Sequence, residues 1–222
     1  MAGCGRIIRM PAGSVTLEGE LVIPGGARGV VVFAHGSGSS RHSPRNQAVA
    51  TVLQVSGLAT LLVDLLTSEE EAIDTRTSHL RFDIPLLARR LMAIDAWLTD
   101  QPATSTLRLG YFGASTGAGA ALIAAAEQPE RIGAVVSRGG RPDLAGQYLP
   151  AVKAPTLLVV GGRDEVVIEL NEQAQRQLQA PRHLEIVPGA THLFEEPGAL
   201  ERVAALARDW FLRYLVPTGQ PA

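Results

Sequence analysis

Residues 107–121 read LRLGYFGASTGAGAA, and this stretch predicts the centre of the fold. An apolar run leads into Gly113-Ala114-Ser115-Thr116-Gly117, and small residues typical of a helix start follow. A serine on such a strand–turn–helix needs tiny flanking residues because the backbone of the turn is cramped. Gly113 and Gly117 meet that need. The turn lifts the hydroxyl clear of the sheet, which makes Ser115 a candidate nucleophile.

Composition indicates one globular domain. The chain has 222 residues, of which 46% are hydrophobic and 19% charged, enough apolar material for a sizeable core. We expect a single domain over residues 1–222, with a core of about 15–215 and loose ends. A net charge of −2 argues against a nucleic-acid partner. Cys4 is the only cysteine, which excludes an intramolecular disulfide framework.

From the hydropathy pattern we expect a cytoplasmic protein. No run approaches the ~18 apolar residues of a membrane span, and the first residues carry no apolar stretch typical of a signal peptide. We therefore expect no membrane partner, and either a monomer or a homodimer. His42, His79 and His183 have no partners at metal-ligand spacing, so we expect neither a metal nor a cofactor.

Strand and helix patterns alternate along the chain, which indicates a mostly parallel sheet covered on both faces. We expect a three-layer α/β/α sandwich of about seven or eight strands without a cap domain. Residues 1–13 read as a loose lead-in, 67–81 as a long connection, and 138–152 as a crossover with one short helix. Besides residues 107–121, strands are expected at 15–23, 29–34, 59–64, 133–137, 156–160 and 183–187, and helices at 44–57, 84–98, 166–179 and 200–215.

Two further loops supply the partners that a serine nucleophile needs. A serine hydroxyl requires a base to take its proton and an acid to orient that base. Asp164 follows one expected strand and His192 follows the next. Loops at the carboxyl ends of parallel strands share one crevice, so these side chains are expected to meet Ser115. Glu165 is the alternative acid.

The loop after residues 29–34 predicts an oxyanion hole. It reads HGSGSS from His35 to Ser40, a glycine-rich connection between a strand and a helix. We expect one donor to be the backbone N–H of Thr116 and the other that of Ser37, with Gly38 as the second choice. His35 is expected to have a structural role rather than to act as a base.

These features resemble the α/β-hydrolases, and in particular the cap-less dienelactone hydrolase-like branch. The resemblance covers roughly residues 15–215 and rests on four segments, each after an expected strand. The segments are His35-Gly36, Gly113–Gly117, Gly162-Arg163-Asp164 and Thr191-His192. The order Ser115, Asp164, His192 is the one this fold uses. Dienelactone hydrolases carry cysteine at the elbow, so the serine here favours general ester hydrolysis over lactone specificity.

Several side chains beside the expected crevice are candidates for substrate binding. Arg138 and Arg141 flank a pair of glycines after a strand and are candidates for binding an acidic group, although solvated surface charge is the alternative. Leu193 and Phe194 are candidates for lining the substrate pocket, and packing in the core is the alternative role for both. The candidates are Gly38, Arg41, Arg138, Arg141, Leu193 and Phe194.

The sequence thus predicts a serine hydrolase that cleaves small or short-chain carboxylic esters through an acyl-enzyme. Two alternatives stay open. The same triad serves acyl transfer, thioester cleavage or peptide cleavage, and a hydrolase-like module can bind a ligand without turning it over.

Overall fold

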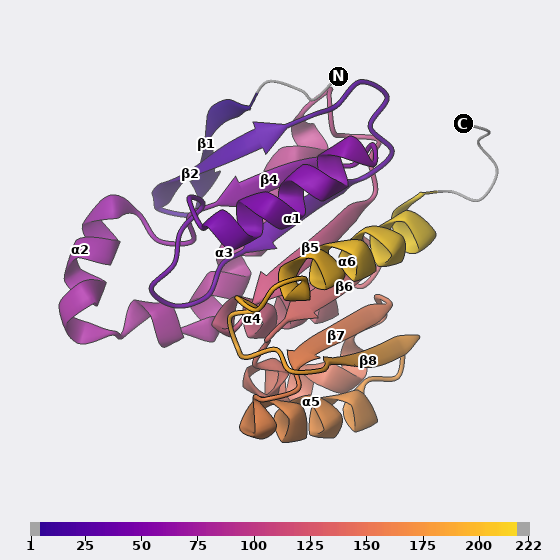
Figure 1. The fold of residues 1–222 in the computed structure, drawn as a ribbon. Coiled ribbons are helices and arrows are strands. Elements are labelled where there is room, and N and C mark those ends of the chain that lie inside the picture. Colours follow the sequence, from indigo (N-terminus) through magenta and orange to yellow (C-terminus); the bar gives the residue numbers. More distant parts are fainter. Residues whose placement is uncertain (1–4, 217–222) are drawn as a thin grey trace.

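The computed structural model describes residues 5–216, and one eight-stranded sheet organises them (Figure 1). The strand order is β1-β2-β4-β3-β5-β6-β7-β8. Neighbouring strands from β4 to β8 run parallel, and β1 and β2 join one edge antiparallel. The strands are β1 Arg6–Ala12, β2 Val15–Val22, β3 Val30–Ala34, β4 Ala59–Val63, β5 Leu109–Ala114, β6 Ile132–Arg138, β7 Thr156–Gly161 and β8 Arg182–Val187. The predicted three-layer α/β sandwich of seven or eight strands is confirmed.

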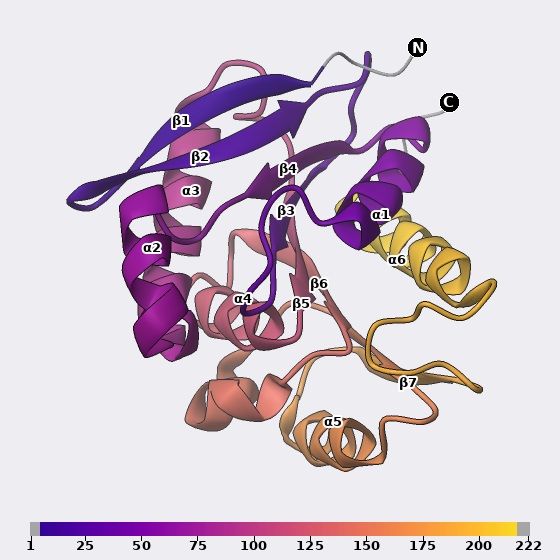
Figure 2. The same ribbon diagram turned by 60° about the vertical axis from the view of Figure 1, so that its left-hand side comes forward.

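Helices cover both faces of the sheet (Figures 1 and 2). α1 (Pro44–Val55) and α6 (Ala199–Leu215) pack together on one face and enclose one core. The second core lies under α3 (Ile84–Asp100), α4 (Thr116–Glu127), α5 (Glu165–Gln177) and the 3₁₀ helix η2 (Pro142–Ala151). β3, β5, β6 and β7 are buried at every residue because both of their faces are covered. No helix within residues 5–216 is long and apolar enough to cross a bilayer.

Local chemistry explains where two of the helices begin. The Ser43 hydroxyl accepts a hydrogen bond from the N–H of Asn46, and Pro44 occupies the first position of α1, as predicted. The Asp83 carboxylate accepts a hydrogen bond from the N–H of Leu86 at 2.9 Å, which starts α3 as predicted.

The interpretation of residues 1–13 as a loose lead-in is wrong for its described part. Residues 6–12 form β1, whose alternate side chains Ile8, Met10 and Ala12 are buried against the sheet. The two exposed arginines and Pro11 obscure this alternation in the sequence, and the strand depends on pairing with β2. Residues 1–4 lie outside the described part.

The connection at 67–81 also contains more structure than expected. It forms α2 (Ser68–Thr77) and the short 3₁₀ helix η1 (Leu80–Phe82), and α2 projects from the edge of the molecule (Figure 1). Thr67 and Glu70 make a reciprocal capping box at the start of α2. Because α2 has only one buried residue, Asp74, it shows no apolar stripe in the sequence.

Candidate active site

Ser115 stands on a strained turn between β5 and α4. Its backbone has φ 48° and ψ −122°, a conformation that residues other than glycine rarely adopt. The flanking glycines are required by close packing. A Cβ on Gly113 would lie 2.4 Å from the Cα of Ala118, and one on Gly117 would lie 2.3 Å from the carbonyl oxygen of Ala34. The turn therefore has the geometry predicted for a nucleophile elbow.

The turn after β6 holds the main chain of Ser115 from both sides. The N–H of Ser115 donates to the carbonyl of Arg138 at 3.3 Å, and the N–H of Arg141 donates to the carbonyl of Ser115 at 3.0 Å. The same turn is anchored to α5, where the buried amide of Asn171 donates to the carbonyl of Gly140 at 3.0 Å. Residues 138–141 and Asn171 thus support the strained serine. Asn171, in the middle of a helix, carries no sequence pattern that points to this role.

Asp164 and His192 meet at the same edge of the sheet. His192 Nδ1 lies 2.6 Å from Asp164 Oδ2. The carboxylate is acceptor-only when ionised, so this contact places the ring proton on Nδ1 and leaves Nε2 able to accept a proton. Backbone hydrogen bonds tie the two loops together, including one from the N–H of Arg163 to the carbonyl of Ala190 at 2.9 Å. The acid paired with His192 is therefore Asp164 rather than its neighbour Glu165.

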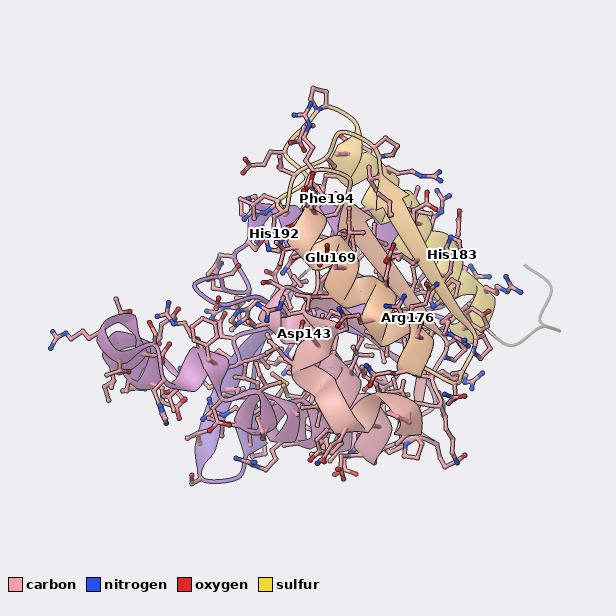
Figure 3. The ribbon with its side chains drawn as sticks, turned by 90° about the horizontal axis from the view of Figure 1, so that it is seen from below. Asp143, Glu169, Arg176, His183, His192 and Phe194 are labelled. Carbon is pink, nitrogen blue, oxygen red and sulfur yellow. The ribbon has the colours of Figure 1, made fainter. Side chains whose placement is uncertain are left out.

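The two histidines of the β8 region lie apart. His192 follows the carboxyl end of β8, whereas His183 lies near the start of that strand (Figure 3). His183 Nε2 lies 3.3 Å from Glu185 Oε2, two residues further along the same strand. The His192 side chain is 39% exposed and that of Asp164 17%, so the imidazole is accessible to solvent while its carboxylate partner is mostly covered.

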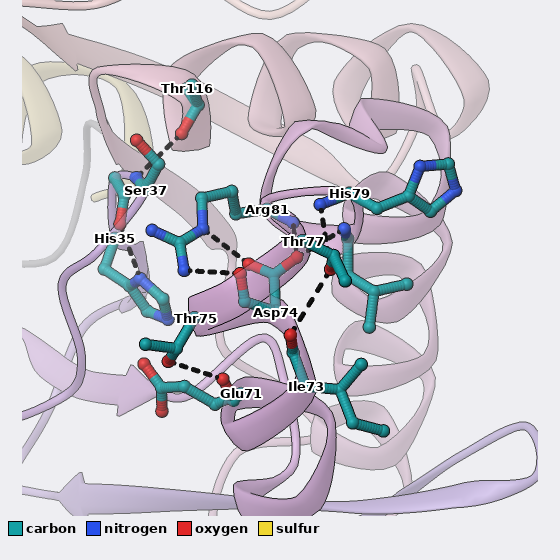
Figure 4. Close-up of polar contacts among 12 residues, drawn as sticks. His35, Ser37, Glu71, Ile73, Asp74, Thr75, Thr77, His79, Arg81 and Thr116 are labelled. Atoms are coloured by element: carbon teal, nitrogen blue, oxygen red, sulfur yellow. Dashed lines mark hydrogen bonds and ion pairs between the residues drawn. The ribbon is translucent and has the colours of Figure 1, made fainter.

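The loop after β3 lies against the start of α4. The N–H of Ser37 donates to Thr116 Oγ1 at 2.9 Å, so this candidate oxyanion donor already has an acceptor (Figure 4). Gly38, the second choice, has φ 70°. Thr116 is the first residue of α4, where backbone N–H groups have no acceptor within the helix. The loop is therefore placed where the sequence predicts it, with one donor occupied.

His35 has the structural role that the sequence predicts. Its Nε2 accepts a hydrogen bond from the N–H of Leu65 at 3.1 Å, which requires the ring proton to be on Nδ1. Nδ1 lies 2.9 Å from the carbonyl of Gly36 and can donate to it. Both nitrogens are thus engaged with backbone, which leaves none to act as a base.

The segment formed by α2 and η1 brings a second charged pair, Asp74 and Arg81, against the loop after β3. Arg81 lies between Asp74 and the loop that carries His35 and Ser37 (Figure 4). Asp74 is fully buried and accepts hydrogen bonds from the guanidinium of Arg81 and from two backbone N–H groups. Burial raises the pKa of Asp74, but these hydrogen bonds outweigh burial and hold the pKa below 3.8. No sequence pattern points to Asp74 itself, but Thr67 and Glu70 stand at capping-box spacing and could have predicted the helix that carries it.

The three candidate arginines have different surroundings. Arg41 pairs with Asp64 and with Glu18, and Arg141 makes two hydrogen bonds of 2.8 Å to Asp143. Arg138 is 6% exposed, and within residues 5–216 it pairs with no carboxylate. Of these three guanidiniums, only that of Arg138 is without an acidic partner in the described part of the chain.

Leu193 and Phe194, the two residues after His192, differ in burial. Leu193 is 38% exposed beside the histidine, so it remains a candidate for contact with substrate. Phe194 is 1% exposed and belongs to the core under α1 and α6, with φ 57°. Figure 3 shows it on the same loop as His192. Its burial favours the alternative of core packing.

Comparisons with known proteins agree with this architecture. A dienelactone hydrolase from Anabaena variabilis has 64% sequence identity and a TM-score of 0.95, covering 96% of this chain and 99% of that one. Est1E from Butyrivibrio proteoclasticus has 16% identity and a TM-score of 0.79, covering 95% and 98% of the two chains, and shows the same fold.

One sequence relative is much longer. A Mycobacterium tuberculosis protein, provisionally named a phosphoribosyl transferase, is 59% identical over 212 residues. The match covers 96% of this chain but 47% of that protein, so the chain spans about half the length of this relative. The model of the dienelactone hydrolase family matches residues 17–215. With that match and the Anabaena structure in agreement, the chain belongs to the dienelactone hydrolase family.

Proposed function

We propose that this chain is a serine hydrolase that cleaves carboxylic esters with small or short acyl groups. The hydrogen bond between His192 and Asp164, at the sheet edge that also carries the strained Ser115, is the observation on which the proposal rests. Family membership supports hydrolysis as the reaction class. The exposed His192 side chain, and the lack of a cap domain among residues 5–216, support small substrates.

In the proposed mechanism, Ser115 Oγ attacks the ester carbonyl while His192 Nε2 takes its proton. Asp164 orients the ring and stabilises the imidazolium. The tetrahedral oxyanion receives hydrogen bonds from the N–H groups of Thr116 and Ser37. The alcohol leaves with the proton from His192, and a water activated by the same base hydrolyses the acyl-enzyme.

The mechanism requires two local adjustments. The Ser115 hydroxyl makes no hydrogen bond within residues 5–216, so its contact with Nε2 has to form when substrate binds, as is common in ligand-free enzymes. The N–H of Ser37 must also exchange Thr116 Oγ1 for the oxyanion.

The name of the longer M. tuberculosis relative does not alter this proposal. A serine activated by a histidine–aspartate pair attacks carbonyl carbon, and nothing in residues 5–216 favours transfer of a phosphoribosyl group over acyl chemistry. We therefore assign no transferase activity to this chain.

The test combines a covalent probe with two variants. A fluorophosphonate followed by mass mapping should label Ser115, and Ser115→Ala and His192→Ala should each reduce p-nitrophenyl acetate turnover by about three orders of magnitude or more. Circular dichroism and thermal melting should show that both variants are folded. A folded wild-type protein that remains unlabelled would refute the enzyme, and full activity in His192→Ala would refute this base.

Competing nucleophiles separate the related acyl chemistries. Turnover in the presence of added alcohols or amines should yield free acid as the main product. A predominant transfer product would change the assignment to an acyltransferase while leaving the triad in place.

A further inference from the structure

Phe194 has a backbone conformation that is unusual for a large side chain. Within residues 5–216, the residues other than glycine with positive φ are Ser78 at 54°, Ser115 at 48° and Phe194 at 57°. Ser78 ends helix α2 in the left-handed conformation, which is common at that position. Ser115 is the proposed nucleophile. Phe194 is the remaining case, and a bulky residue at positive φ is an outlier because its Cβ crowds the following carbonyl oxygen.

Phe194 closes the turn that carries the proposed base. Its N–H donates to the carbonyl of Thr191 at 3.2 Å, so His192 and Leu193 are the two central residues of a four-residue turn. Leu193 is 38% exposed, whereas Phe194 is 1% exposed. The base therefore stands on a surface turn whose last residue is fixed in the interior.

Burial of the Phe194 ring accounts for its strained backbone. The ring belongs to the core under α1 and α6, together with Phe33 of β3 and Phe112 of β5. These two strands lead to the oxyanion loop and to Ser115. A strained conformation persists only where the surrounding packing outweighs its cost. Burial of an aromatic ring outweighs the strain of one residue, so packing holds Phe194 at this φ.

The rest of the segment from Thr191 to Gly198 lies at or near the surface. Phe194 is its only buried residue. The N–H of Thr191 donates to the Glu196 carboxylate at 3.0 Å, but this hydrogen bond is exposed to solvent. The ion pair that joins Glu195 to Arg45 is also weak, because the Glu195 side chain is 64% exposed and water screens the pair. The ring is therefore the main anchor of this segment.

The chemistry of His192 depends on where this turn lies. His192 Nδ1 is 2.6 Å from Asp164 Oδ2, and Asp164 belongs to a different loop, the one after β7. The contact therefore requires the turn after β8 to keep its place relative to the loop after β7. A displacement of a catalytic group by about 1 Å can lower turnover about a hundredfold.

We infer that Phe194 is the positioning residue of the base. Its ring, fixed in the core, keeps the turn of residues 191–194 where His192 meets Asp164. Phe194 touches neither substrate nor reacting atoms and acts through His192. The consequence for turnover rests on the proposed function, whereas the placement of His192 against Asp164 does not.

The first arm of the test measures the contact between His192 and Asp164 without any substrate. A histidine Nδ1 proton that is shared with a carboxylate gives a far-downfield proton NMR signal, and loss of that signal in His192→Gln assigns it. Phe194→Leu should reduce its intensity about fivefold or more, because a loosened turn exposes the proton to exchange with water. Absence of the signal in the wild type would overturn the inference, since the contact would then not be held.

Phe211→Leu is the matched control. Phe211 lies on α6 in the same core and is 0% exposed, so the same substitution removes the same volume. A Cβ on Gly110 would lie 2.9 Å from its ring, which places Phe211 beside the start of β5, whereas Ser115 follows the end of that strand. The control should lower the melting temperature and leave the NMR signal and kcat unchanged. Equal loss of the signal in both variants would overturn the inference.

The second arm measures turnover of p-nitrophenyl acetate. Phe194→Leu should lower kcat about tenfold or more and change KM less than about threefold, because the base is displaced while the substrate contacts remain. Wild-type kcat in a folded Phe194→Leu variant that has lost the NMR signal would contradict the proposed base, His192, and leave the positioning role of Phe194 in place.

The two proposals fail separately. Absence of ester turnover in the wild type would refute the proposed function, while NMR would still decide the role of Phe194. Amide hydrogen exchange in the wild type provides a test even if Phe194→Leu does not fold. The N–H of Phe194 should exchange about tenfold or more slowly than that of Leu193. Equal exchange of the two amides, or a wild-type NMR signal in folded Phe194→Leu, would overturn the inference.

Discussion

Replacing Asp95 by Asn should change how the stability of this protein depends on pH. Asp95 lies on α3 and is 0% exposed. It accepts a hydrogen bond from the hydroxyl of Tyr111 on β5, the strand that leads to Ser115. Its Oδ1 is buried without a partner in the described chain. Burial raises the pKa of Asp95 from 3.8 to about 7, although the Tyr111 hydroxyl and Arg131 oppose the shift.

The direction in which stability changes with pH depends on how the pKa of Asp95 differs between the folded and unfolded states. Because the folded pKa is the higher one, the stability associated with protonated Asp95 is fully present below about pH 3.8. It is lost as the pH rises toward 7. The two pKa values differ by about 3 pH units, and each unit corresponds to 1.36 kcal/mol, so the loss amounts to about 4 kcal/mol.

Urea unfolding of both proteins between about pH 5 and pH 8 measures this effect. The free energy of unfolding of Asp95→Asn minus that of the wild type should rise by about 1.4 kcal/mol per pH unit up to about pH 7, and then level off. Other carboxyl groups titrate in both proteins and cancel in the difference. An asparagine oxygen can still accept from Tyr111, which limits the structural change. A difference that stays constant across this range would refute the reasoning.

Two further predictions concern the support of the active site. Gly139→Ala should lower kcat for p-nitrophenyl acetate about tenfold or more, because at φ 49° its Cβ would lie 3.0 Å from the carbonyl oxygen of His192. Gly146→Ala has the same strain, with φ 46°, but no atom within 4 Å, so it should lower the melting temperature and leave kcat unchanged; equal kcat losses in both variants would contradict the steric argument. Asp74→Asn should speed amide hydrogen exchange across residues 68–82, since it removes the charge that holds Arg81. Unaltered exchange across residues 68–82 would show that the Asp74–Arg81 pair does not hold α2 and η1 in place.

Much of the fold could be predicted because its signals are local. A run of β-branched residues such as Val30 to Val32 predicts a strand buried on both faces, and the structure has one there. Ser43 and Asp83 cap the helices that they were expected to start, since a cap needs only the next few backbone N–H groups.

The elements that were missed depend on contacts made at a distance. β1 is held by pairing with β2 and by burial of every second side chain, although Arg9 and Pro11 interrupt the apolar pattern. α2 buries only Asp74 and is stabilised at its start by Thr67 and Glu70. Neither has the apolar periodicity on which helix and strand predictions rest.

The sequence by itself determined which residues could form a triad. Ser115, Asp164 and His192 each follow a strand, and the carboxyl ends of parallel strands share one edge of the sheet. Only the tertiary structure decided which of the nearby arginines are paired with carboxylates and which are buried. Arg41 and Arg138 look alike in sequence, yet among residues 5–216 the first meets two carboxylates and the second meets none. The reason is physical: pairing and desolvation of a charge depend on segments far apart in the chain, and these distances exist only once the chain has folded.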